Sequence, residues 1–281
     1  MFRLSIIATT IGNEKNVDLF INAFTDFNIN FPLELIILYQ CGIYKLKNPR
    51  KENLTIEIIN YKNKISLSQA RNICVKKSKY EYVCVLDDDI IPGKDILESI
   101  KTVFINEKAD LFCGRIMAGE DTPYLPQFKL TQAKLISFTS LNYFMGACHG
   151  FRKDLFDSQK IYDEDFGMGA LYNSGEETDL LLKALSKKYK VIYDPNIYVY
   201  HPPVDNSLSS TKIYNYSLGY GALMKKHCKV LQKHLILIRI FFIPLAHHML
   251  RAVFHVRKKE REVYFNIIKG FFLGFINYQK H

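Results

Sequence analysis

Short apolar runs alternate with segments of helical periodicity along the first two thirds of the chain. Runs rich in Ile, Val, Leu and Tyr predict strands at residues 3–8, 34–39, 54–59, 82–86 and 110–116. Segments whose apolar residues recur every three or four positions predict helices between them, at residues 16–24, 68–77 and 95–104. This alternation indicates β-α-β units, so we expect an α/β fold with a mostly parallel sheet flanked by helices.

The pattern is less regular beyond residue 118. Residues 119–138 contain Pro123 and Pro126 and predict a loop. The other predicted elements are a strand at 142–151, a helix at 176–188 and two short strands at 191–193 and 197–201. Small polar residues at 206–210 predict a hinge. We therefore expect one large α/β domain over residues 1–205 and a helical C-terminal region over residues 206–281.

The net charge of +10 lies in the C-terminal region. Residues 1–210 hold 25 Lys and Arg against 26 Asp and Glu, a balance of −1, whereas residues 211–281 hold 13 against 2, a balance of +11. Such asymmetry indicates an anionic partner, either a lipid surface or a nucleic acid.

Two segments of the C-terminal region, residues 235–243 and 263–278, are apolar and aromatic. Neither has the ~20 uninterrupted apolar residues that cross a bilayer. With Arg257, Lys258 and Lys259 they predict helices that lie on an anionic membrane surface, and we favour this partner over nucleic acid. The alternative is a helical appendage packed on the domain with a solvated basic face.

The six cysteines form no Cys-x-x-Cys pair, and several lie in apolar runs. This distribution indicates reduced thiols in a cytosolic protein. The apolar stretch at residues 4–8 is too short for a secretory signal. We therefore expect a cytoplasmic protein, peripheral on the inner face of the cell membrane.

Three consecutive aspartates, Asp87, Asp88 and Asp89, follow the predicted strand at 82–86. Because like charges repel at this separation, a hard divalent cation shared with phosphate oxygens is a natural companion of such a group. Ligands of open α/β sheets bind at the carboxyl ends of strands, which favours a metal site here. The alternative is a solvated turn in which one aspartate caps the next helix.

A second acidic group, Glu176, Glu177 and Asp179, opens the predicted helix at 176–188. Ser174 and Glu177 have the spacing of a capping box, and acids suit the first turn of a helix. A capping box needs only one acid, however, and a carboxylate held here can act as a general base. The residues alone leave both interpretations open.

Other candidates are single residues. His201 ends a predicted strand and could ligate a metal, and Lys62, Lys64 and Arg71 could meet phosphates near the end of the third strand. Each of these residue types is also common on an ordinary surface.

The order of these motifs resembles the GT-A-fold glycosyltransferases of family 2 over roughly residues 3–203. Residues 67–72 (Leu-Ser-Gln-Ala-Arg-Asn) are close to the family's Gly-Leu-Ser-x-Ala-Arg-Asn, with Ser66 in place of the glycine. Residues 85–89 stand at the family's Asp-x-Asp position. Residues 162–167 and 175–180 resemble its acceptor-side loop and its Glu-Asp motif.

The resemblance implies a nucleotide pocket and a metal site. Thr9, Gln40 and Arg71 would line the nucleotide pocket. Asp87 and Asp88 of the acidic triplet would also contact the nucleotide. Asp89 and His201 would bind Mn²⁺ or Mg²⁺ that bridges the diphosphate.

The resemblance also implies the catalytic groups. Glu177 takes the place of the family's usual base, an Asp one methylene shorter, while Glu176 and Asp179 would orient acceptor or base. The implied enzyme is metal-dependent and inverting, and moves a sugar from a UDP- or dTDP-sugar to a hydroxyl of a glycan or lipid-linked acceptor in bacterial surface polysaccharide synthesis.

Two other functions stay open on the residues. One is a non-catalytic membrane- or nucleic-acid-binding module with a degenerate transferase domain. The other is a sugar-nucleotide pyrophosphorylase, which would need a glycine-rich basic loop after the first strand, where residues 8–17 contain only Gly12 and Lys15.

Overall fold

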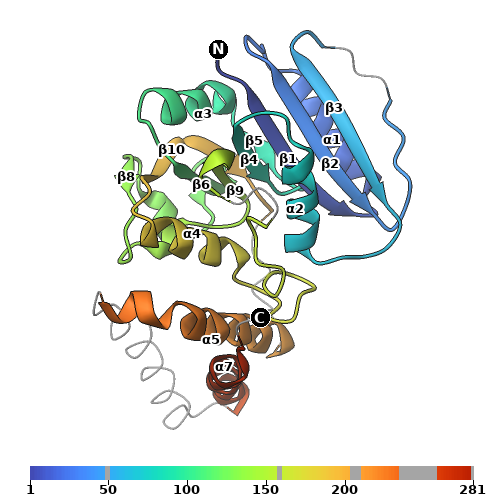
Figure 1. The fold of residues 1–281 in the computed structure, drawn as a ribbon. Coiled ribbons are helices and arrows are strands. Elements are labelled where there is room, and N and C mark those ends of the chain that lie inside the picture. Colours follow the sequence, from blue (N-terminus) through green and yellow to red (C-terminus); the bar gives the residue numbers. More distant parts are fainter. Residues whose placement is uncertain (48–50, 157–159, 203–209, 234–257, 280–281) are drawn as a thin grey trace.

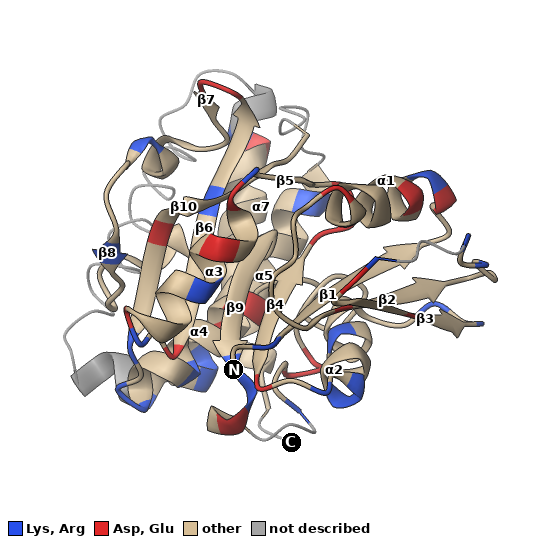
Figure 2. Ribbon diagram, turned by 90° about the horizontal axis from the view of Figure 1, so that it is seen from above, with Lys and Arg blue, Asp and Glu red and all other residues tan. Residues whose placement is uncertain are grey.

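The computed structural model describes residues 1–47, 51–156, 160–202, 210–233 and 258–279. A mixed sheet in the order β3-β2-β1-β4-β9-β6-β10-β5 forms its centre, and α1 and α2 cover opposite faces of this sheet (Figure 1, Figure 2). The predicted α/β fold is therefore confirmed. The strands are β1 Leu4–Ile11, β2 Leu33–Gln40, β3 Leu54–Tyr61, β4 Tyr82–Leu86, β5 Ile91–Pro92, β6 Leu111–Gly119, β7 Thr122–Pro123, β8 Lys134–Leu135, β9 Cys148–Arg152 and β10 Val191–Tyr200.

The helices of the described residues are α1 Glu14–Thr25, α2 Leu67–Lys77, α3 Ile96–Ile105, α4 Glu176–Ser186, α5 Ser210–Lys233 and α7 Lys258–Asn277. Single 3₁₀ turns lie at Pro126–Lys129, Leu141–Tyr143 and Lys153–Leu155.

The first half of the chain folds as the sequence predicts. Strands β3, β2, β1 and β4 pair in parallel, and their carboxyl ends therefore share one edge. Every residue of β2 is buried, because helices cover both faces of a parallel sheet. This arrangement places the residues that follow β4 at the ligand-binding edge.

The second half departs from the prediction at two strands. The strand expected at 142–151 begins only at Cys148, and β9 runs antiparallel between β4 and β6. The apolar residues before it, Phe144 and Ala147, lie in a loop and are buried there. Their burial explains why this segment has the apolar pattern of a strand. The two short strands expected at 191–201 form one strand, β10, whose register shifts between Asp194 and Tyr198. Pro195 falls within this irregularity, where its missing N–H is tolerated.

Local capping explains how α2 begins. Ser66 accepts a hydrogen bond from the backbone N–H of Gln69, and the Gln69 side chain accepts one from Ser66 in return, a complete capping box. Lys76 and Lys77 occupy its last turn, where they complement the helix dipole, and Figure 2 shows the basic residues at this helix.

Helix α4 begins differently. Gly175 precedes it at φ 90°, a left-handed conformation that suits glycine, and no side chain caps the helix. Of the two interpretations left open for this segment, the capping box of Ser174 and Glu177 is therefore not formed. The Ser174 hydroxyl instead donates to the backbone carbonyl of Tyr216 in α5 at 3.3 Å.

The C-terminal region packs on the sheet domain through α5, which lies below α4 in Figure 1. Leu223 of α5 is buried against Phe166 and Tyr172. Helix α7 then packs on α5 through glycines: a Cβ added at Gly274 would collide with the backbone of Leu218. Close backbone contact of this kind lets two helices approach tightly.

Of the helices in the described ranges, none is long and apolar enough to cross a membrane. The predicted hinge at 206–210 lies almost wholly outside the described residues, as do the apolar segment 235–243 and Arg257.

Candidate active site

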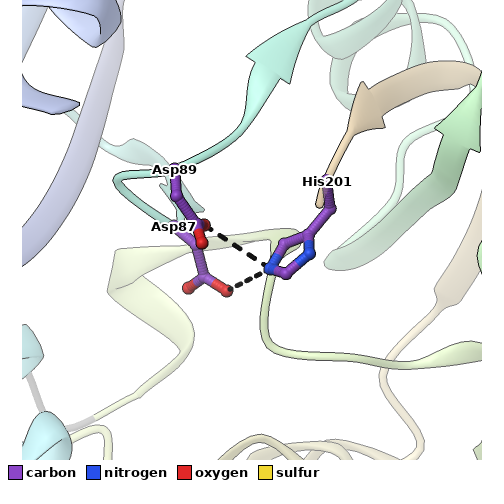
Figure 3. A group of neighbouring side chains, drawn as sticks. All are labelled: Asp87, Asp89 and His201. Atoms are coloured by element: carbon purple, nitrogen blue, oxygen red, sulfur yellow. Dashed lines mark ion pairs between the residues drawn. The ribbon is translucent and has the colours of Figure 1, made fainter. Parts of the chain in front are cut away.

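The acidic triplet and a histidine meet at the carboxyl edge of the sheet. Asp87 and Asp89 follow β4, and His201 follows β10. His201 Nε2 lies 3.5 Å from Oδ1 of Asp89 and 4.0 Å from Oδ2 of Asp87, as Figure 3 shows. One potential ligand atom from each of the three residues lies within 4.8 Å of the others.

The tautomer of His201 suits a metal ligand. Its Nδ1 lies 2.8 Å from the carbonyl oxygen of Pro202, and since a carbonyl can only accept, the Nδ1–H donates to it. This hydrogen bond orients the ring and directs Nε2 at the two carboxylates, an arrangement common around histidine ligands of metals. Two carboxylate oxygens and an imidazole nitrogen are ligands that bind Mn²⁺ in proteins.

Arg71 links the two acidic groups of the chain. Its side chain is 3% exposed, with Nη1 3.0 Å from Oε1 of Glu176 and Nη2 3.2 Å from Oδ1 of Asp87. The Tyr162 ring lies beneath the guanidinium at 5.6 Å. Burial raises the pKa of the Asp87 carboxyl, and the Arg71 charge counteracts this increase.

Glu176 and Glu177 lie at the mouth of α4 in different surroundings. Glu176 is buried and paired with Arg71, whereas Glu177 is partly exposed and lines a cleft. Burial, together with the negative charge of Glu176, raises the pKa of Glu177 to about 8. A carboxyl with such a pKa can both accept and hold a proton near neutrality.

Asp179 has a separate environment. It is fully buried and pairs with Lys183 at 2.6 Å, Lys226 at 2.6 Å and His227 at 2.8 Å. Burial opposes its charge, but the hydrogen bond with His227 and the two lysines hold the pKa of Asp179 well below its usual range. Two of these partners belong to α5, so Asp179 joins α4 to α5 and does not line the cleft.

The cleft has a volume of about 540 Å³, a usual size for a small-molecule site. Its lining brings together five of the predicted residues, Arg71, Asp87, Glu176, Glu177 and His201. Asp89 joins them through its approach to His201.

Three predicted nucleotide-binding residues are not part of this lining. The Gln40 side chain accepts a hydrogen bond from the backbone N–H of Ile65 at 2.8 Å and so fixes the loop before α2. Thr9 lies near the end of β1 and does not line the cleft. Asp88 does not line it either, and burial raises the pKa of its carboxyl. Lys62 and Lys64 are exposed and do not line the cleft either.

The sequence reasoning missed the residues that α5 contributes. Lys212, Tyr216, Tyr220 and Leu223 line the cleft, although they follow the segment on which the motifs lie. Their spacing of three or four residues was the available signal, because it places them on one helix face.

A family of known proteins matches the first part of the chain. The sequence profile described as glycosyl transferase family 2 matches residues 9–160. No curated protein sequence matches the chain significantly.

Solved structures share the fold at low sequence identity. S. aureus TarS 1–349 is 14% identical, with a TM-score of 0.64 over 97% of this chain and 81% of that chain, and the same values hold for its complex with UDP-GlcNAc. The mannosyltransferase PcManGT from Pyrobaculum calidifontis, in complex with GDP-Man and Mn²⁺, is 10% identical, with a TM-score of 0.64 over 98% of this chain and 86% of that chain.

Replacing Arg71 with Met tests its role between the acidic groups. The change leaves the buried Glu176 without its cation and removes a cationic partner from the partly exposed Asp87, so we expect the free energy of unfolding to fall by about 3–5 kcal/mol at neutral pH. Unpaired buried carboxyls have a raised pKa in the folded state, and stability is then lost as pH rises above the unfolded values. Urea unfolding followed by circular dichroism should show a smaller loss at pH 5 than at pH 8.

Arg152→Met is the matched control. Arg152 also pairs with three carboxylates, of Glu81, Asp110 and Asp154, but its side chain is 34% exposed. We expect a loss of about 1 kcal/mol or less, because solvent screens such pairs. Equal losses for the two variants would contradict the assignment of Arg71 as the buried link.

Proposed function

We propose, because this chain belongs to glycosyl transferase family 2, that it transfers a sugar from a nucleotide-sugar donor to an acceptor hydroxyl, with a divalent metal and with inversion at the anomeric carbon. One observation carries the proposal: Asp87, Asp89 and His201 converge at the cleft that Glu177 also lines. The cleft thus combines a cation site with a carboxylate base.

Asp87, Asp89 and His201 would hold Mn²⁺ or Mg²⁺. The bound ion supplies positive charge to the diphosphate of the leaving group. The Asp87 carboxylate is kept in place by Arg71 and the His201 ring by Pro202, so the ligands are oriented in advance. The nucleotide-sugar ligands of TarS and of PcManGT support a nucleotide-sugar donor, for which a UDP- or dTDP-sugar is our expectation.

Glu177 would act as the base on the acceptor hydroxyl. Glu176 is held by Arg71, which leaves Glu177 as the carboxylate of α4 that is open to the cleft. A single displacement with an oxocarbenium-like transition state, similar to that of inverting glycoside hydrolysis, needs one base and no covalent intermediate. In this proposal Asp179 positions α4 through its pairs with Lys226 and His227.

A membrane-bound location is the second part of the proposal. One face of α7 carries Arg261, Phe265, Lys269, Phe272 and Ile276 at helical spacing, and all five are exposed. Basic and aromatic residues on one exposed helix face suit the headgroup region of an anionic bilayer. We therefore propose a cytoplasmic protein on the inner face of the cell membrane that acts on a glycan or lipid-linked acceptor in surface polysaccharide synthesis.

Calorimetry tests the metal and the donor. We expect Mn²⁺ to bind in the presence of UDP-GlcNAc, dTDP-glucose or GDP-mannose, and Asp89→Asn and His201→Ala to weaken Mn²⁺ binding by roughly tenfold or more. Asp95→Asn is the control, because Asp95 is exposed and makes no capping hydrogen bond. If neither Mn²⁺ nor Mg²⁺ binds with any of these donors, the non-catalytic module becomes the better reading.

Glu177→Gln tests the base. We expect kcat to fall by about 10²–10⁴, with the donor Kd within twofold of wild type. The wild-type rate should rise with pH through about 8, because the base acts when ionised, and the residual rate of the variant should lack this rise. A variant that keeps its turnover would remove Glu177 from this role.

The same substitution has a stability signature. The folded state keeps the Glu177 proton that an unfolded chain loses above pH 4.5, so wild-type stability declines as pH rises toward 8. Gln cannot ionise, and the decline should be shallower in the variant.

Sedimentation with vesicles tests the membrane proposal. We expect binding to phosphatidylglycerol vesicles at low salt, weaker binding at high salt and little binding to phosphatidylcholine vesicles. Phe272→Glu on α7 should reduce binding, whereas Leu19→Glu on the exposed face of α1 should not. Equal binding to neutral vesicles, or an unaffected Phe272→Glu variant, would refute it.

A further inference from the structure

A face of α5 forms one wall of the catalytic cleft. Tyr216 and Tyr220 are one helical turn apart, line the cleft with Leu223, and are 43% and 39% exposed. Aromatic rings that stay partly exposed beside catalytic groups offer flat apolar surfaces to a ligand. The acceptor side of the reaction is therefore bounded by residues outside the family motifs.

Buried contacts fix this wall relative to the base. A Cβ at Gly219 of α5 would collide with Ser174, just before α4, so the two elements are in backbone contact. Asp179 of α4 pairs with Lys226 and His227 of α5 in the interior. Because Glu177 lies on the same helix as Asp179, the tyrosines are held at a set position from the base.

A second hollow continues the cleft beyond Tyr220. It has a volume of about 410 Å³ and shares Met145, Thr178 and Tyr220 with the cleft. Thr178 directly follows Glu177 in the sequence. The two hollows therefore adjoin at Thr178 and Tyr220, next to the proposed base, and together they are called the groove.

The far hollow has the chemistry of a sugar subsite. The exposed Asn142 and Thr139 line it together with the partly exposed ring of Tyr220, so an amide and a hydroxyl lie beside an aromatic ring. Amides hydrogen-bond hydroxyls, and rings cover the apolar faces of pyranoses. A hydrocarbon chain in this place would desolvate the exposed Asn142 amide without offering it a hydrogen bond.

We propose, on the basis of the proposed transferase function, that the acceptor is an oligosaccharide of at least two sugar residues. Its terminal residue lies beside Glu177, and its second residue lies in the far hollow, with Tyr220 between the two. Tyr220 is thus a specificity-determining residue for acceptor length.

The test compares acceptors of different length at a saturating concentration of the nucleotide-sugar donor. The probes are p-nitrophenyl mono- and disaccharides with the same terminal sugar, and the octyl glycoside of that sugar. We expect kcat/KM for disaccharides to exceed that for monosaccharides by roughly tenfold, a difference of about 1.4 kcal/mol. Tyr220→Ala should remove most of this preference, and Tyr220→Phe, which keeps the ring, should retain it.

Tyr80→Ala is the control for loss of a partly exposed aromatic residue, since Tyr80 lies just before β4 and does not line the groove. It should keep the wild-type preference. Equal kcat/KM for both sugar lengths, or a preference for the octyl glycoside, would overturn the proposal, and the latter would indicate a lipid chain in the far hollow. Failure of the proposed function looks different, because no donor would then be consumed with any probe.

Discussion

The buried guanidinium of Arg71 is the contact on which the catalytic geometry depends. It holds Asp87 after β4 and Glu176 at the start of α4, residues 89 positions apart in the chain. Burying Glu176 and partly burying Asp87 costs desolvation free energy, which a shared cation with good geometry offsets. The positions of Asp87, a proposed metal ligand, and of α4, which carries the proposed base, therefore depend on one side chain of α2.

The three acidic residues at the start of α4 have different surroundings. Glu176 is neutralised by Arg71, and Asp179 by the cations of α4 and α5, so both serve the architecture. Glu177 lies between them in sequence, faces the cleft and lacks a cationic partner among the described ion pairs. Glu177 and Asp179, two positions apart, thus acquire pKa shifts of opposite direction because their helix positions face different surroundings.

The local features of the chain were readable from its sequence. The run at 82–86 matches β4, and the aspartates after it lie at the sheet edge because parallel strands end there. That Ser174 does not cap α4 was not readable, since its hydroxyl bonds to Tyr216, which is 42 residues away. Arg71 was predicted to meet phosphates, and its burial depends on Glu176, which is 105 residues away. Contacts at such separation leave no periodic signal in the chain.

The wall that α5 contributes has a consequence for how such proteins diversify. The residues proposed for chemistry come from the strand ends and from α4, while the rings proposed to contact the acceptor come from a helix beyond the profile match at 9–160. Substitutions along that one helix face can change which molecule is elongated and leave the reaction itself intact. Selection can therefore act on product identity and on turnover through different stretches of the gene.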